Sequence, residues 1–163
     1  MKPPEGANSS VRPNELLSPC RQFTPNTEEG HALMTKFASQ TVPCLQYFAR
    51  AVIKSKTCTS VAYPAEKATD NKTVRFLWEG SAAYGVVSFY CMRGRDMYAV
   101  IRKFDICEEN YFKHQEIDIK ISHIIPVKMS DLVLVVPVSD IYTKVFRVHD
   151  FVCEDLNCYE QKL

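Results

Sequence analysis

The sequence predicts a mainly β protein of the α+β class: a small antiparallel barrel or sandwich of six or seven strands, preceded by one or two α-helices and a disordered N-terminal arm. Apolar and polar residues alternate over much of 73–153, which is typical of half-buried strands. The connections between these segments are short, and no helix-length pattern lies between them. A chain of 163 residues, 46% hydrophobic and 24% charged, can bury the core of one such domain.

The N-terminal region is predicted to form an arm, and it shows no export signal. Residues 1–26 carry five prolines and little periodicity, so we expect them to be disordered. The start, Met1-Lys2-Pro3-Pro4, leads into polar residues and lacks the apolar segment of a secretory signal. The seven cysteines are odd in number and irregularly spaced, as expected of free thiols in a reducing compartment. These features together predict an intracellular protein.

The next segment, 27–56, is predicted to be helical. Asn26 or Thr27 is suited to cap a first helix, and the two glutamates that follow complement the positive end of its dipole. Pro43 interrupts the helical pattern. A second helix then fits 43–55, because a proline in the first turn of a helix loses no hydrogen bond.

The remaining domain, residues 70–160, is predicted to form the barrel. A tight hairpin is predicted over Arg93–Asp96, where Gly94 can adopt a positive φ. A second turn is predicted over 128–131. The predicted strands are 73–80, 84–92, 97–106, 117–127, 132–138, 142–148 and 151–153.

The stretch 123–148 is rich in Val, Ile and Leu, but it is not expected to cross a membrane. Lys128 and Asp131 interrupt it, whereas a transmembrane helix needs about 20 apolar residues. Within it, the sequence DLVLVVPV is almost continuously apolar, which predicts a strand that is buried on both faces. Pro137 cannot donate to a strand ladder, so we expect it at an edge or a bulge.

The charges predict no strong global attraction to nucleic acid or membrane, because the net charge is +1. They are unevenly distributed: 31–104 holds eleven Lys and Arg against four Asp and Glu, and 105–163 holds six against eleven. Two basic patches, at 50–56 and 93–103, support nucleic-acid binding as an alternative function. Their candidate residues are Arg50, Lys54, Lys56, Arg93, Arg95, Arg102 and Lys103.

The sequence favours a protein that is not an enzyme and has no cofactor. Phosphate-binding glycine loops, nucleophile-elbow motifs and zinc-protease motifs are all lacking. One zinc-like spacing exists, in which His149, Cys153 and Cys158 lie close together along the chain. A structural zinc site needs a second ligand pair at similar spacing, so buried or idle cysteines are the preferred interpretation and no metal is predicted.

Aromatic residues are concentrated in the first three predicted strands. Small barrels often hold peptides with aromatic side chains on the rim. Trp78, Tyr84 and Tyr98 are therefore the candidate ligand-binding residues, with a protein or peptide segment as the partner. The alternative is that these rings pack in the core or across strands.

Several segments also resemble a known group. NKTVRFLWEGSAAYGVVSFY, MYAVIRKFDI, HIIPV, LVVPVSDIYTKVFRV and DLNCYEQ occur in this order. Residues 70–160 thereby resemble the BAH-like or SH3-like C-terminal region of uncharacterised, transposable-element-associated animal proteins. Leu156 stands where that group has a proline. The matching positions are Tyr84, Gly85, Tyr98, Val100, Pro137, Asp140, Ile141, Asn157, Tyr159 and Glu160.

The resemblance implies no catalytic residues, and by fold analogy it implies binding of chromatin proteins. It also favours the nucleus over the cytoplasm. The first hypothesis is therefore a non-catalytic intracellular interaction module that binds a protein or peptide segment in a chromatin or transposon-derived context. The second is the nucleic-acid binder described above. A third is an orphan gene product without a defined activity.

Overall fold

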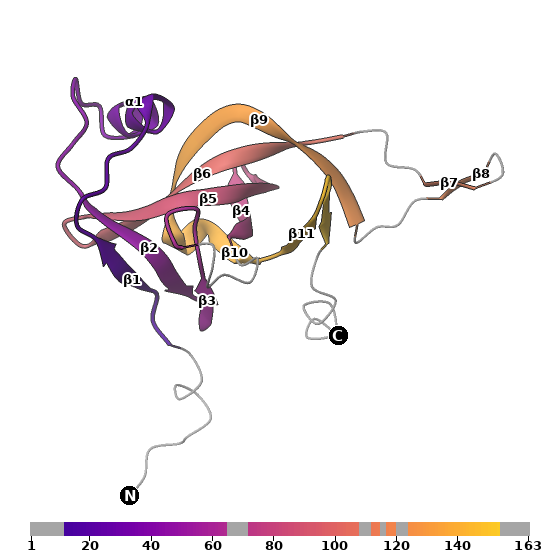
Figure 1. The fold of residues 1–163 in the computed structure, drawn as a ribbon, viewed down its shortest axis with the longest axis horizontal. Coiled ribbons are helices and arrows are strands. Elements are labelled where there is room, and N and C mark those ends of the chain that lie inside the picture. The colour runs from indigo at the N-terminus through magenta and orange to yellow at the C-terminus, as the bar shows by residue number, and fades with distance from the viewer. Residues whose placement is uncertain (1–11, 65–71, 108–111, 115–116, 120–123, 154–163) are drawn as a thin grey trace, which may run out of the picture.

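The computed structural model describes residues 12–64, 72–107, 112–114, 117–119 and 124–153. These residues form a mainly β structure with one α-helix, and its antiparallel main sheet curls into a half-barrel (Figure 1). The predicted fold class is thus confirmed. The strands are β1 (Glu15–Cys20), β2 (Gln46–Ile53), β3 (Lys56–Cys58), β4 (Thr73–Trp78), β5 (Ser81–Arg93), β6 (Asp96–Ile106), β7 (Phe112–His114), β8 (Ile117–Ile119), β9 (Ile124–Pro137), β10 (Ile141–Lys144), β11 (Phe146–Val148) and β12 (Phe151–Cys153).

The sheet follows the order β1-β2-β5-β6-β9-β12-β11, with β3 beside β2, β4 beside β5 and β10 beside β4. The short strands β7 and β8 pair with each other in a separate hairpin. The predicted strand over 117–127 is therefore described as β8 and the start of β9, and 120–123 between them lies outside the described residues.

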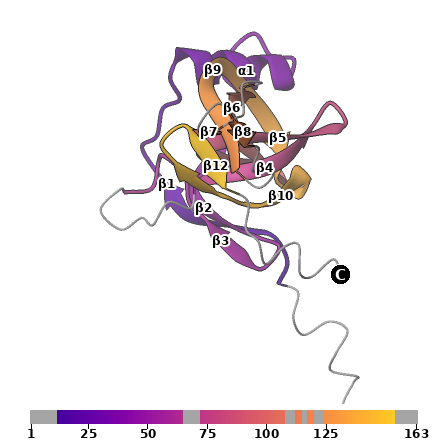
Figure 2. The same cartoon turned by 90° about the vertical axis from the view of Figure 1, so that its right-hand side faces the viewer.

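Helix α1 (Thr27–Lys36) begins at Asn26, as predicted. The Asn26 side chain accepts a hydrogen bond from the Glu29 backbone N–H at 2.8 Å, and the Glu29 carboxylate accepts one from the Asn26 N–H at 2.9 Å. This reciprocal capping box satisfies two N–H groups at the helix start. Leu33 then anchors the helix, since its side chain is fully buried against the sheet. Figure 2 shows α1 lying along the arch of β9.

The predicted second helix over 43–55 is wrong, because Gln46–Ile53 forms β2. This strand pairs with β1 on one edge and with β5 on the other. Tyr47, Phe48, Val52 and Ile53 are aromatic or β-branched, and such residues suit a strand that has neighbours on both edges. Tertiary pairing therefore overrides the helical spacing of this segment.

The predicted disordered arm is also corrected in part. Glu15–Cys20 forms β1, and Leu16 is buried where this strand pairs with β2. The Arg50 side chain of β2 donates a hydrogen bond to the Ser18 hydroxyl at 2.8 Å. Residues 1–11 lie outside the described residues. The sheet consequently includes segments before residue 70, where the barrel was predicted to begin.

The hairpin predicted over Arg93–Asp96 is confirmed. Arg93 and Asp96 are paired across the turn, and Gly94 has a φ of 62°. This left-handed conformation is easily adopted by glycine, and it matches the twist of the flanking strands β5 and β6.

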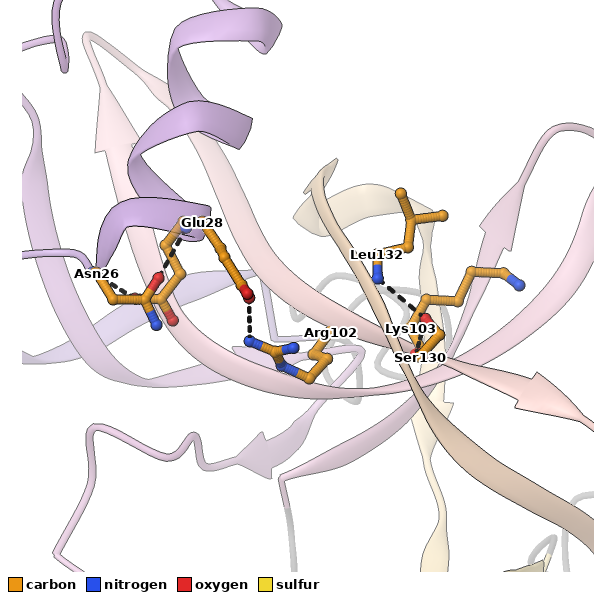
Figure 3. Close-up of polar contacts among 7 residues, drawn as sticks. Asn26, Glu28, Arg102, Lys103, Ser130 and Leu132 are labelled. Atoms are coloured by element: carbon orange, nitrogen blue, oxygen red, sulfur yellow. Dashed lines mark hydrogen bonds and ion pairs between the residues drawn. The ribbon is translucent and has the colours of Figure 1, made fainter.

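The turn predicted over 128–131 is wrong, because β9 continues through it as a bulged strand. Phe104 of β6 is paired with Met129, whereas Arg102 is paired with Val133. Two extra residues of β9 are thus accommodated opposite Lys103. The Ser130 hydroxyl donates to the Lys103 carbonyl at 2.6 Å and accepts from the Leu132 N–H at 3.1 Å (Figure 3). These hydrogen bonds satisfy polar groups that the bulge removes from the ladder.

Beyond the bulge, β9 is buried on both faces, as its continuous apolar sequence predicts. Leu134 and Val136 belong to the core inside the half-barrel. Val133 and Val135 pack with Leu33 in a second cluster beneath α1. The strand ends at Pro137, which precedes the short 3-10 helix η2 (Val138–Asp140).

Candidate functional site

A groove with a cavity volume of about 510 Å³ lies between α1 and β9. We call it the α1–β9 groove. It is mainly apolar, with charged residues toward its ends. Its lining residues are Glu28, His31, Ala32, Thr35, Lys36, Trp78, Asp131, Leu132, Val133, Leu134 and Val135.

One wall of the groove is a single stripe of α1. The lining positions 28, 31, 32, 35 and 36 are spaced three and four residues apart, which places them on one side of the helix. Leu33 lies outside this stripe and is buried in the cluster beneath the helix. The helix therefore uses one side to pack on the sheet and another to border the groove.

The opposite wall is an edge of β9. Five consecutive residues, 131–135, line the groove, although successive side chains of a strand point to opposite faces. A cavity that touches all five must run along the edge of the strand. On the edge away from β6, the described strands pair with β9 only at Ile124–Pro126, through β12.

Trp78 and Leu132 supply apolar surface to the groove. Trp78 ends β4, is half-buried and packs on the core inside the half-barrel. Leu132 follows the bulge and keeps 48% of its surface exposed. Transfer of such surface from water into a contact is favourable by about 25 cal/mol per Å². The groove can therefore bind an apolar segment.

The groove has an acidic end and a basic end. Glu28 binds Arg102, which is paired with Val133, and Asp131 lies just before this point on β9. Lys36 lies 6.0 Å from the ring centre of Tyr98, which is paired with Pro137. Helix α1 and strand β9 thus run in the same direction along the groove, from carboxylates to an ammonium group.

The three predicted aromatic ligand-binding residues have different environments. Trp78 lines the α1–β9 groove. Tyr84 is only 4% exposed and belongs to a core cluster with Phe104, so its predicted place on an exposed rim is wrong. Tyr98 is half-buried, and its ring meets Phe37 edge-on at 5.1 Å, where it packs against the end of α1.

The seven predicted basic residues do not form one face. Arg50 lies over the Tyr63 ring at 4.9 Å and binds Ser18. Arg93 and Arg95 lie at the β5–β6 hairpin, and Arg93 stacks on Phe37 at 4.8 Å. Arg102 binds Glu28, and the half-buried Lys103 donates to the Phe104 carbonyl at 3.4 Å.

Lys54 and Lys56 belong to a different basic cluster, which the sequence did not reveal. The Lys54 ammonium and the Arg75 guanidinium lie 5.1 and 5.6 Å from the ring centre of Tyr142. Tyr142 is 41% exposed. Lys144 and Lys56 both lie near Cys58, where their positive charges favour the ionised form of its thiol. The pairing of β10 with β4 brings Tyr142 and Lys144 beside Arg75, and the contact of β10 with β3 brings Lys54 and Lys56 to the same place.

Within the described parts of the chain, no three or more His, Cys, Asp or Glu residues gather as a metal site. His149 and Cys153 are described, but Cys158 lies outside the described residues. Burial raises the pKa of Cys58 to about 11 and that of Cys91 to about 12. Both thiols are therefore protonated at neutral pH and are poor nucleophiles.

Comparisons with known proteins give no match: no family model, curated protein or solved structure is similar to this chain. Among the described residues, no helix has both the length and the apolar character needed to cross a membrane. The α1–β9 groove and the basic cluster around Tyr142 are therefore the two candidate binding sites of the described residues.

Proposed function

We propose that this protein is a non-catalytic interaction domain that binds a segment of a protein partner in the α1–β9 groove. The groove itself is the observation that carries the proposal. It combines exposed apolar surface, at Leu132 and Trp78, with an edge of β9 that the described strands leave unpaired. Such a combination suits capture of a peptide segment, because burial of apolar surface supplies affinity and pockets for the peptide side chains supply specificity.

The context of this binding is proposed from the sequence. The resemblance of 70–160 to BAH-like regions favours a partner from chromatin or from a transposon-derived assembly, and hence an intracellular, nuclear location.

A peptide library displayed on phage tests the proposal. We expect the purified chain to enrich peptides, and Leu132→Glu to reduce their affinity at least tenfold by placing a charge on the apolar surface. Met129→Glu is the matched control, because Met129 is an exposed residue of the same strand that does not line the groove. The proposal is wrong if no peptide is enriched, or if Leu132→Glu binds the enriched peptides as the unaltered chain does.

A second candidate function is binding of single-stranded nucleic acid at the cluster of Lys54, Lys56, Arg75, Tyr142 and Lys144. The favouring observation is that two cations share one exposed ring. Cations contact phosphates, and aromatic rings stack on bases.

Binding of labelled oligonucleotides at several salt concentrations tests this second function. We expect affinity to fall steeply with salt, because phosphate contacts release counterions. Tyr142→Ala should weaken binding, whereas Phe146→Ala, an exposed aromatic residue outside the cluster, should not. Equal binding by both variants, or an affinity that does not change with salt concentration, would contradict nucleic-acid recognition at the cluster around Tyr142.

A further inference from the structure

We infer that the partner segment binds as an added β-strand, antiparallel to the edge of β9 at residues 131–135. This inference rests on the proposed function, since it states how the α1–β9 groove holds its partner. The expected ligand is an extended segment of about five residues with apolar side chains, an acidic residue at its N-terminal end and a basic residue at its C-terminal end.

The backbone of β9 supports strand addition. In an antiparallel pair, alternate residues direct their N–H and C=O groups toward one neighbour and the residues between direct theirs away. The pairing of β9 with β6 therefore leaves alternate backbone groups facing the groove. Natural sheet edges are usually protected by lysine, proline or bulges within the strand. Residues 132–136, Leu-Val-Leu-Val-Val, contain no lysine, proline or bulge, and α1 borders this edge from the other side of the groove.

The available edge is short and bounded. The bulge at Ser130 disrupts the ladder at one end, and Pro137, which has no N–H, stops it at the other. The stretch 131–135 spans about 13 Å as a strand. The α1 stripe from position 28 to position 36 spans about 12 Å as a helix. Both walls of the groove thus match a segment of about five residues.

The surroundings of the edge determine which side chains the added strand can carry. On one face of β9, Val133 and Val135 pack in the cluster beneath α1, and Ala32 borders the groove there. On the other face, Leu134 belongs to the core of the half-barrel and Trp78 packs against this core. Side chains on both faces of the added strand therefore meet apolar surface, which favours valine, isoleucine or threonine at its central positions.

The charges determine the order of the polar ends. Every described strand pair of the main sheet is antiparallel, and antiparallel pairing is the more stable per residue. An antiparallel segment starts near Pro137 and Lys36 and finishes near Asp131. An acidic first residue can therefore pair with the Lys36 ammonium, and a basic last residue with the Asp131 carboxylate, as opposite charges attract across an interface.

Two synthetic peptides of identical composition test the charge order. One contains Glu-Val-Thr-Val-Lys and the other Lys-Val-Thr-Val-Glu, each with the same neutral flanks and a fluorescent label. We expect the full chain to bind the first peptide roughly fivefold more tightly, since two rim charge pairs contribute modestly. The double variant Lys36→Glu with Asp131→Lys should reverse this preference. Equal affinities, or no binding up to about 1 mM, would overturn the assigned ligand and direction.

Backbone N-methylation tests the pairing itself. A methyl group removes one N–H donor of the peptide without changing its side chains. Because alternate N–H groups of an added strand face β9, methylation at every second residue should lower affinity roughly tenfold, and methylation at the residues between should have little effect. Equal effects at all positions would overturn strand addition.

The Leu132→Glu variant separates the inference from the proposed function. If it loses binding while N-methylation shows no alternation, the groove binds peptides in another conformation and only strand addition fails. If it binds as well as the unaltered chain, the groove is not the site and both proposals fail. Met129→Glu again controls for the added charge.

Discussion

Arg102 donates a hydrogen bond to the Glu28 carboxylate at 2.6 Å, which joins the first turn of α1 to the middle of β6 (Figure 3). The two residues are separated by 74 positions in the sequence. Because Arg102 is paired with Val133, this ion pair fixes the position of α1 along the β9 edge. The two walls of the groove, α1 and β9, are therefore joined through strand β6.

The first prediction concerns this ion pair. Glu28→Gln should lower the free energy of unfolding by less than about 1 kcal/mol, because the Glu28 side chain is 55% exposed and solvent screens the pair. Chemical denaturation at low and high salt measures this loss, which should shrink as salt rises. Glu79→Gln, at the exposed β4–β5 turn, is the control. A loss of several kcal/mol would mean that α1 depends on this pair rather than on buried Leu33.

The second prediction concerns the bulge of β9. Ser130→Ala removes the hydroxyl that binds both the Lys103 carbonyl and the Leu132 N–H. We expect a loss of about 1–2 kcal/mol in the free energy of unfolding, since these backbone groups lose their partner. Peptide affinity in the groove should also fall, because the bulge positions Leu132.

Ser139→Ala is the matched control, as Ser139 is an exposed residue of η2 outside the groove. Denaturant melts and peptide titrations of both variants measure the effects. If Ser130→Ala behaves like Ser139→Ala in both assays, the hydroxyl does not hold the bulge.

The third prediction compares two glycines. A Cβ at Gly85 would lie 2.5 Å from the Arg102 carbonyl oxygen and from Ile101 Cγ2, so Gly85→Ala must displace β6 backbone. We expect a loss of about 3 kcal/mol or more from this overpacking. Gly94→Ala meets open space but keeps a positive φ of 62°, which costs about 1–2 kcal/mol. Thermal melts that rank these two variants in the opposite order would contradict the close approach of β5 and β6.

Much of the β architecture could be predicted from short-range patterns. The hairpin around Gly94 follows from turn chemistry, and the burial of 132–136 on both faces follows from its unbroken apolar sequence. The patterns were less informative where pairing partners decide the structure. The segment 43–55 carries a spacing that suits a helix, yet β1 and β5 make it a strand. Lys128–Asp131 looks like a turn, yet Ser130 supplies hydrogen bonds that keep β9 continuous.

The candidate site was predicted only in part, for a physical reason. Trp78 is an aromatic residue in an alternating strand, and it does line the groove. Tyr84 has the same sequence signal but is buried, because alternation shows that a strand has two faces without showing which face meets solvent. The edge of β9 that the described strands leave unpaired has no local signal in the sequence, since strand order depends on contacts between distant segments.

The last prediction concerns the pH dependence of stability. Burial raises the pKa of Cys91 from 9.0 to about 12, and that of Cys58 from 9.0 to about 11. In the unfolded chain both thiols ionise near pH 9, whereas in the folded chain they retain their protons to higher pH. Their contribution to stability is therefore complete below pH 9 and is lost as pH rises from about 9 toward 12.

Urea denaturation from pH 7 to 10.5 measures this loss, and Cys91→Ala should flatten the decline above about pH 9. Cys44→Ala is the control, because it removes an exposed thiol in place of a buried one. Buried Tyr90, whose pKa burial raises well above 10.0, should preserve part of the decline in both variants. If Cys91→Ala leaves the slope unchanged, Cys91 ionises as easily in the folded chain as in the unfolded chain. Strand β5 would then be more accessible to water than its packing against Phe37, Leu45 and Tyr98 implies.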